Sequence, residues 1–235
     1  MNNLNPLFSI VFPVMNQADH IESVILSYHR ELTKQKFSFE LIAVVNCTKD
    51  NSFEICKKVT KELPNVSAYE LKGCGFGLGI LHGLKKSRGK YLCWVSSART
   101  YPDELAKCLK KFLANQEVII NGARKKRDRF LRSLGALIYD LTCKLVFNIS
   151  SSDINGIPKV FSRKTYEKLD LQFTDSMIDL ELHEKAKRLN IPVIEIPIYK
   201  NIRHGGGSTS NFKTIFRLMK EVIRYWLRTR LFRLL

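Results

Sequence analysis

The chain has 235 residues, 45% of them hydrophobic, so it can bury the core of one α/β domain with a short appendage and is not expected to be disordered. Its 39 Lys and Arg outnumber 22 Asp and Glu, and the formal net charge of +17 indicates either anionic partners or a solvated basic exterior. No segment has the roughly 18 consecutive apolar residues of a membrane span.

The N-terminal stretch MNNLNPLFSIVFPV lacks the basic start and the small-residue cleavage site of a signal peptide. The cysteines are scattered, with no C-x-x-C pair and no histidine at metal-ligand spacing, which argues against a zinc site. This pattern predicts reduced thiols in a cytoplasmic protein. The cysteines are Cys47, Cys56, Cys74, Cys93, Cys108 and Cys143.

Apolar strands alternate with amphipathic helices through the first half of the chain. The helical patterns are IESVILSYHREL, residues 52–63 and residues 102–115. The strand patterns are LFSIVFPV, FELIAVVNC, VSAYEL, KYLCWVSS and EVIING. This alternation predicts an α/β fold with a mostly parallel central sheet covered by helices on both faces. Ligands of such sheets bind beyond the carboxyl ends of the strands.

The second half is less regular, but it contains no linker and no internal repeat. A basic stretch, RKKRDRFLR, precedes the apolar helix SLGALIYDLTCKLVF, in which Leu137, Ile138, Leu141 and Leu145 are candidates for the core. We expect residues 1–210 to form one domain and residues 211–235 to form a basic amphipathic helical tail.

Six motifs occur in an order that resembles glycosyltransferase family 2, most of all its dolichyl- or polyprenyl-phosphate sugar transferase branch. They are FPVMNQADHI, VVNCTKDNSFEI, GFGLGILHGLKKSRGKYL, DINGIPKVFSR, IDLELHEKAKRLNIPVIEIPI and RHGGGST. Together they cover most of the chain. The resemblance implies the GT-A fold and transfer of a sugar from a nucleotide donor with inversion.

The resemblance also implies which residues bind the donor. Asn46 stands where the family usually has an acid and Gln17 where it has Glu; an amide can hydrogen-bond a base or ribose but carries no charge. Asp50 fits a ribose ligand or, preferably, a helix cap. The glycines at 75, 77, 79 and 83 fit a backbone near a pyrophosphate or, preferably, tight packing of a helix on the sheet. The implied donor-binding residues are Pro13, Met15, Asn16, Asn46, Gly75, Ser96, Ser97 and Arg99.

The family's Asp-x-Asp metal motif corresponds here to Ser96-Ser97-Ala98. Serine hydroxyls are poor ligands for Mg²⁺ or Mn²⁺ and alanine offers none, so we expect no metal cofactor. Arg99 and the basic stretch would then stabilise the leaving phosphate. A donor with one phosphate, or loss of catalysis, explains the same change.

The implied catalytic residues are Asp153, Asp179 and Glu181, which would orient or activate the acceptor. Asp179 and Glu181 can equally mark the first turn of a helix. The implied phosphate- or acceptor-binding residues are Arg129, Arg132, Ser133, Arg203, His204 and Ser208. A solvated basic helix face is the alternative for the first three.

The segment 213–235 has apolar residues on one helical face and Lys and Arg on the other, which predicts an interfacial helix on an anionic membrane surface. Packing on the domain or on a second subunit is the alternative. The sequence thus predicts a cytoplasmic transferase at the inner face of the membrane, acting on a polyprenyl phosphate or a lipid-linked or cell-surface glycan. The rival hypothesis is an inactive scaffold that binds an active transferase or itself. Nucleic acid is not expected, since charge alone supports it.

Overall fold

The computed structural model describes residues 5–125, 130–200, 202–205 and 212–231, and the side chains of these residues except 130–136, 212–218 and 230–231. The elements are β1 (Phe8–Val14), α1 (Ile21–Lys34), β2 (Phe39–Asn46), α2 (Ser52–Glu62), β3 (Val66–Leu71), α3 (Phe76–Lys86), β4 (Tyr91–Trp94), α4 (Pro102–Ala114), β5 (Ile119–Arg124), α5 (Phe130–Phe147), β6 (Lys159–Ser162), α6 (Arg163–Leu169), α7 (Ile178–Arg188), β7 (Val193–Ile198) and α8 (Phe212–Leu231).

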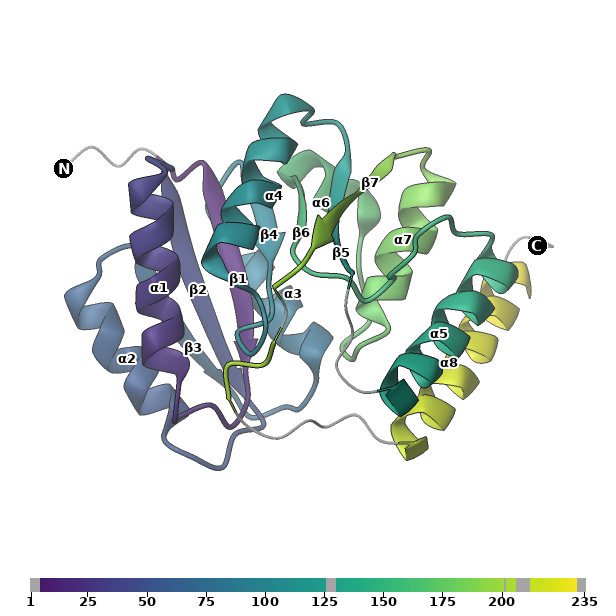
Figure 1. Ribbon diagram of the computed structural model, residues 1–235, viewed down its shortest axis with the longest axis horizontal. Helices are drawn as coiled ribbons and strands as arrows, with labels where there is room; N and C mark the ends of the chain where they lie inside the picture. Colours follow the sequence, from purple (N-terminus) through teal and green to yellow (C-terminus); the bar gives the residue numbers. More distant parts are fainter. Residues whose placement is uncertain (1–4, 126–129, 201, 206–211, 232–235) are drawn as a thin grey trace.

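The strands of the described chain form one sheet in the order β3-β2-β1-β4-β6-β5-β7 (Figure 1). β1 pairs in parallel with β2 and β4, β2 with β3, and β5 with β7. β6 alone in this sheet runs antiparallel to its neighbours, β4 and β5. The predicted mostly parallel sheet is therefore confirmed, and the carboxyl ends of β1, β2 and β4 lie at the same edge.

Both faces of the sheet are buried under helices. On one face Phe8, Ile10 and Phe12 pack in a core with residues of α1, α2 and α4. On the other face, Val11 packs in a second core with residues of α3, α6 and α7. The central strands β1, β2 and β4 are mainly apolar because both of their faces are covered.

A third cluster joins α5 and α8 to the domain through Tyr139, Cys143, Met177, Leu180 and Val222. The expectation that the apolar side chains of the α5 helix form core is wrong for the four named candidates. Among the described side chains of α5, Tyr139, Asp140 and Cys143 are buried toward the domain, and the opposite side of this part of the helix is exposed. Those candidates are 47% to 76% exposed: Leu137, Ile138, Leu141 and Leu145.

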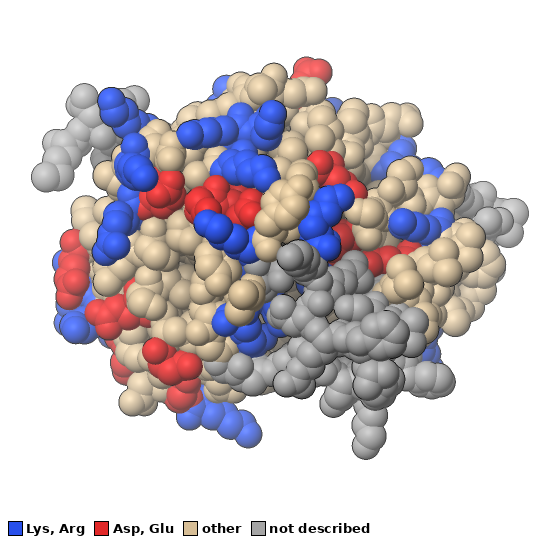
Figure 2. All heavy atoms as spheres, in the orientation of Figure 1, with Lys and Arg blue, Asp and Glu red and all other residues tan. Residues whose placement is uncertain are grey.

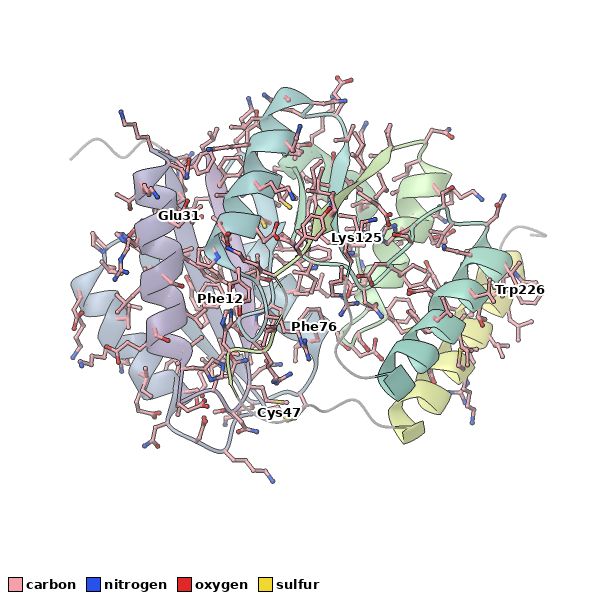
Figure 3. All side chains as sticks on the ribbon, viewed as in Figure 1. Phe12, Glu31, Cys47, Phe76, Lys125 and Trp226 are labelled. Carbon is pink, nitrogen blue, oxygen red and sulfur yellow. A yellow bond between two sulfur atoms is a disulfide. The ribbon has the colours of Figure 1, made fainter. Side chains whose placement is uncertain are left out.

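The expectation of reduced cysteines is also wrong for two of them, because Cys47 and Cys74 form a disulfide (Figure 3). Cys47 follows β2 and Cys74 precedes α3, so the fold brings together two thiols that are 27 positions apart. The other four are free and buried. Among the described helices, none combines the length and the apolarity needed to cross a lipid bilayer.

Candidate functional site

Asn16, in the turn after β1, holds the turn after β2. Its backbone N–H donates to Thr48 Oγ1 at 3.0 Å, and its Oδ1 accepts from the backbone N–H of Lys49 at 2.8 Å. Its φ of 51° is in the left-handed region, which asparagine tolerates better than most residues. Met15 beside it is 37% exposed. The turn after β1 and the turn after β2 are therefore held together by these two hydrogen bonds.

Asn46 and Gly75 are brought together. The side-chain amide of Asn46 donates to the carbonyl oxygen of Gly75 at 2.7 Å, directly beside the Cys47–Cys74 disulfide. Gly75 has a φ of 147°, and a Cβ at this position would overlap the carbonyl of Thr174. Gly75 thus lets the start of α3 pack against the loop before α7, which agrees with the packing interpretation of this glycine.

Asp50 stabilises the same corner. Its carboxylate accepts hydrogen bonds from Ser52 Oγ at 2.5 Å, from the N–H of Ala18 at 2.9 Å and from Thr48 Oγ1 at 2.8 Å. Burial alone would raise the pKa of Asp50, but these hydrogen bonds lower it to about 2. The capping interpretation agrees with a further contact, since Asp50 Oδ1 accepts from the backbone N–H of Ser52, the first residue of α2, at 3.1 Å.

The turn that replaces the acidic motif uses its polar groups internally. Ser97 is 1% exposed and its hydroxyl donates to the carbonyl oxygen of Pro13 at 2.8 Å. The N–H of Ser96 donates to Thr100 Oγ1 at 3.1 Å. Ala98 offers no ligand atom on its side chain. In the described part of the chain, no three His, Cys, Asp or Glu residues gather as a metal would require. These residues do not fit a divalent cation.

The segment 202–205 lies against this turn. His204 donates its backbone N–H to the carbonyl oxygen of Ala98 at 2.8 Å, and its ring centroid lies 4.7 Å from that of Tyr101. Arg203 donates through Nε to the carbonyl of Gly205 at 2.8 Å. Two phosphate-binding candidates, residues 203 and 204, are thus beside three donor-binding candidates, residues 96, 97 and 99.

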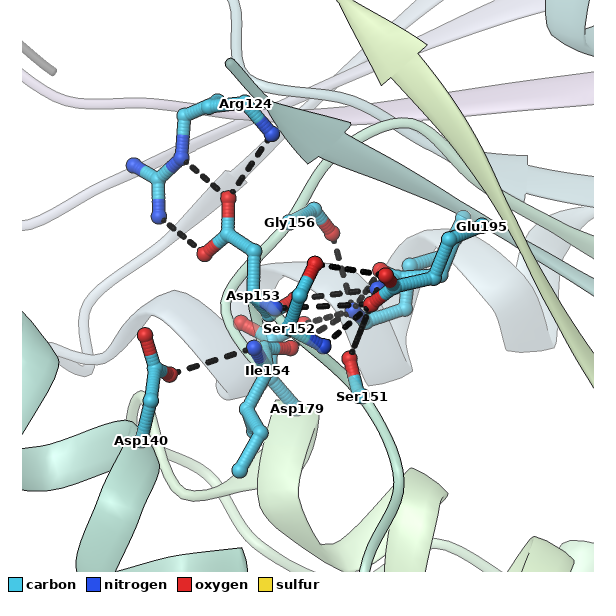
Figure 4. A network of polar contacts seen from close by, with 11 residues as sticks. Arg124, Asp140, Ser151, Ser152, Asp153, Ile154, Gly156, Asp179 and Glu195 are labelled. Carbon is cyan, nitrogen blue, oxygen red and sulfur yellow. Dashed lines mark hydrogen bonds and ion pairs between the residues drawn. The ribbon is translucent and has the colours of Figure 1, made fainter. Parts of the chain in front are cut away.

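A second polar centre lies between β5, β6 and α7 (Figure 4). Asp153 is 1% exposed and accepts from Nε and Nη2 of Arg124, both at 2.7 Å. Burial would lower the pKa of Arg124, but the adjacent Asp153 carboxylate keeps it raised. The Asp153 carboxylate is therefore held as one half of a two-point ion pair.

Lys159 occupies the middle of this centre. Its ammonium group is fully buried, donates to Asn121 Oδ1 at 2.7 Å and lies 3.5 Å from Asp179. Burial lowers the pKa of Lys159 and raises the pKa of Asp179. Glu181 points elsewhere: its carboxylate accepts from the backbone N–H of Gln172 at 2.9 Å. The structure brings Asp153 and Asp179 together and leaves Glu181 outside.

Sequence reasoning missed Lys159 and Glu195. Glu195 accepts hydrogen bonds from Ser151 Oγ at 2.6 Å and from the backbone N–H of Ser152 at 2.7 Å. Burial alone would raise the pKa of Glu195, but the hydrogen bonds outweigh burial and the pKa is lowered. The available signal was a charged residue within each apolar strand pattern, KVFS and VIEIPI. Two acceptor candidates, Arg129 and Ser208, lie outside the described residues. Two others are in α5, but their side chains are not described: Arg132 and Ser133.

Comparison with known proteins gives a consistent result. Residues 9–170 match the model for "Glycosyl transferase family 2". A dolichol-phosphate mannosyltransferase of Pyrococcus furiosus is 21% identical over 225 residues, which are 92% of this chain and 62% of that protein. The low-salt glycan biosynthesis hexosyltransferase Agl6 of Haloferax volcanii is 22% identical over 230 residues, 94% of this chain and 54% of that protein. The chain thus spans about three fifths of these curated relatives.

Solved structures resemble the fold. Glucosyl-3-phosphoglycerate synthase from Mycobacterium tuberculosis, in complex with Mn²⁺, UDP and phosphoglyceric acid, matches with a TM-score of 0.66 and 17% identity, covering 96% of this chain and 78% of that one. A second mycobacterial protein matches with a TM-score of 0.70 and 16% identity, covering 96% and 74%. The GT-A fold predicted from the motifs is confirmed.

Proposed function

The chain belongs to glycosyl transferase family 2, and we propose that it transfers a sugar from a nucleotide-sugar donor to a polyprenyl phosphate or lipid-linked glycan without the usual metal site. The observation that carries the proposal is the contact of His204 with Ala98. It brings the segment that holds Arg203 against the turn where relatives would hold a metal. Guanidinium groups can stabilise the charge of a leaving diphosphate.

In the proposed reaction an acceptor oxygen attacks the anomeric carbon of the sugar, on the face opposite the diphosphate. The bond between that carbon and the diphosphate oxygen breaks, and the nucleotide leaves with the electron pair. Arg99 and Arg203 would take the developing negative charge. Pro13, Met15, Asn16 and Asn46 would shape the nucleotide side of the site.

The state of the acids favours a phosphate acceptor over a hydroxyl. Asp153 is paired with Arg124 and Asp179 with Lys159, and both carboxylates are almost fully buried. A hydroxyl acceptor needs a general base to remove its proton, whereas a phosphate is already an anion. We therefore assign Asp153 and Asp179 to shaping the acceptor side of the site, with residues 129, 132, 133 and 208 as phosphate-binding candidates.

A membrane-surface location is supported by α5 and α8. Leu137, Ile138, Leu141 and Leu145 on α5 are exposed, as are Ile223 and Leu227 on α8, and Figure 2 shows a mainly uncharged surface over α5. Lys220, Arg224 and Arg228 are also exposed on α8, at helical positions next to Leu227. This arrangement is typical of helices that lie in the interface of an anionic bilayer. Val222, in contrast, packs on the domain, so one side of α8 attaches the helix to the domain and the exposed side is available to the membrane.

We propose the cytoplasmic face of the membrane as the site of action. A disulfide such as Cys47–Cys74 is rare in a reducing cytosol, so the thiol state of these residues in cells bears directly on this location.

The test is a transfer assay with a panel of nucleotide sugars and polyprenyl phosphate, with and without EDTA. We expect turnover that survives chelation and falls at least tenfold in Arg203→Ala, because a charge-assisted contact to the leaving group is lost. Turnover that EDTA abolishes would refute metal independence.

An inactive scaffold that binds a partner transferase or a second copy is the alternative. It is favoured by the internal use of the side chains of Asn46 and Ser97, which bond to Gly75 and Pro13. Calorimetry decides between the two: no binding of any common nucleotide sugar would support the scaffold.

A further inference from the structure

A pocket of about 490 Å³ opens between α7 and α8. Phe173 and Tyr225, whose rings meet edge to face at 5.0 Å, form the apolar part of its wall. Arg188 at the end of α7 and Arg228 on α8 line it from opposite helices. The volume is within the range of small-molecule sites.

The charges in this pocket do not cancel. Glu181 accepts hydrogen bonds from the backbone N–H groups of residues 172 and 173 and pairs with Lys185 at 2.8 Å, so this acid and this lysine neutralise each other. Arg188 and Arg228 are exposed, and neither makes a hydrogen bond or ion pair with any described residue. The pocket therefore carries a surplus of two positive charges.

A second pocket, of about 280 Å³, shares Arg188 and Thr229 with the first. On its other side it is lined by Leu145 and Trp226. Leu145 is 76% exposed and belongs to the apolar surface of α5. The two pockets thus adjoin at Arg188 and Thr229 and form one hollow, to which the second pocket adds the apolar side chains of Leu145 and Trp226 within a mainly polar lining.

The remaining charged side chains of the second pocket are already engaged. Glu184 accepts a hydrogen bond from the Tyr225 hydroxyl at 3.0 Å. Lys187 donates to the carbonyl oxygens of residues 147 and 148, at 3.1 and 2.6 Å. Both residues bond to neutral groups and keep their charges, which are opposite in sign and offset each other, and Arg188 is the charged residue that both pockets share.

We propose that this hollow binds the headgroup phosphate of an anionic phospholipid. Arg188 and Arg228 hold the phosphate, because a guanidinium donates two parallel hydrogen bonds to phosphate oxygens. Leu145 and Trp226 contact the glycerol and the first part of the acyl chains. The inference rests on the proposed membrane-surface function and adds to it, because a shaped site selects one headgroup class where a charged helix only attracts negative surfaces.

The experiment is calorimetry of the full chain with short-chain phosphatidylglycerol below its micelle concentration, beside short-chain phosphatidylcholine and inorganic phosphate. We expect saturable binding of phosphatidylglycerol, weakened about tenfold by Arg188→Gln and again by Arg228→Gln, as for loss of hydrogen bonds to a charged group. The matched control is Lys220→Gln with Arg224→Gln, which removes two exposed charges of α8 outside both pockets. It should keep phosphatidylglycerol binding within about twofold of the wild type.

An equal loss in both double variants would reduce the site to general attraction of charge and overturn the proposal. Binding of inorganic phosphate as tightly as of the lipid would overturn the lipid assignment, and absence of lipid binding would overturn both. Far-ultraviolet circular dichroism checks that the variants are folded. Sugar transfer, assayed separately in detergent, should be unchanged in Arg188→Gln/Arg228→Gln. Failure of the lipid site and failure of the transferase proposal are thus told apart.

Discussion

Lys159 and Asp179 form an ion pair in the protein interior, with 3.5 Å between Nζ and Oδ1 and less than 4% of either side chain exposed. The lysine comes from β6 and the aspartate from α7, so the pair joins the one antiparallel strand of the described sheet to the helix that covers it. Asp153 lies close enough to raise the pKa of Lys159, which burial lowers.

Asp179→Asn should therefore lower the free energy of unfolding by about 3 kcal/mol, because it leaves a buried ammonium group without its charge partner. Urea denaturation measures this loss. Asp170→Asn is the control. Asp170 is exposed, and its backbone is in the left-handed region with a φ of 44°, a conformation that suits asparagine. The free energy of unfolding of this variant should therefore not fall. Equal stability of both variants would mean that the pair contributes nothing.

The lowered pKa of Asp50 predicts that the stability of the fold depends on pH. Its pKa falls from 3.8 to about 2 in the folded protein, so the unfolded chain takes up the proton first as pH drops. The stabilisation is complete above about pH 4 and is lost as pH falls toward 2. Urea midpoints across this window should fall more steeply in the wild type than in Asp50→Asn. Parallel slopes would contradict the assignment.

The Cys47–Cys74 disulfide predicts that the stability of the fold falls in the presence of a reductant. Replacing both Cys47 and Cys74 by serine opens a loop of 27 positions and should cost about 3.5 kcal/mol by the chain-entropy account. Dithiothreitol should lower the urea midpoint of the wild type and leave that of the double variant unchanged. Alkylation of intact cells followed by mass spectrometry then shows whether the two thiols are paired in their own compartment.

Restoring the acidic motif should restore the metal. Ser96→Asp with Ala98→Asp places two carboxylates at the turn after β4, and carboxylate oxygens are the usual ligands of Mg²⁺ and Mn²⁺. We expect Mn²⁺ to strengthen nucleotide-sugar binding at least tenfold in this variant and not in the wild type. Ser96→Asn with Ala98→Asn is the uncharged control. Equal Mn²⁺ effects in both would show that the site lies elsewhere.

The alternation of apolar strands and amphipathic helices was enough to predict the mostly parallel sheet, since periodicity is a local property. Contacts between distant segments were not predictable in this way. The pairing of Cys47 with Cys74 depends on how β2 and α3 meet, and the burial of Lys159 depends on Asp179 from a later helix. The exposure of Leu141 follows from which side of α5 the domain covers.

Two consecutive residues at the end of β2 are linked to the segment before α3: Asn46 donates a hydrogen bond to Gly75, and Cys47 is bonded covalently to Cys74. This double link prevents the two segments from separating like a hinge. The turn after β4 has no such covalent link: His204 is held to it by hydrogen bonds to the carbonyl oxygens of Ala98 and Thr100, so this contact is the weaker of the two.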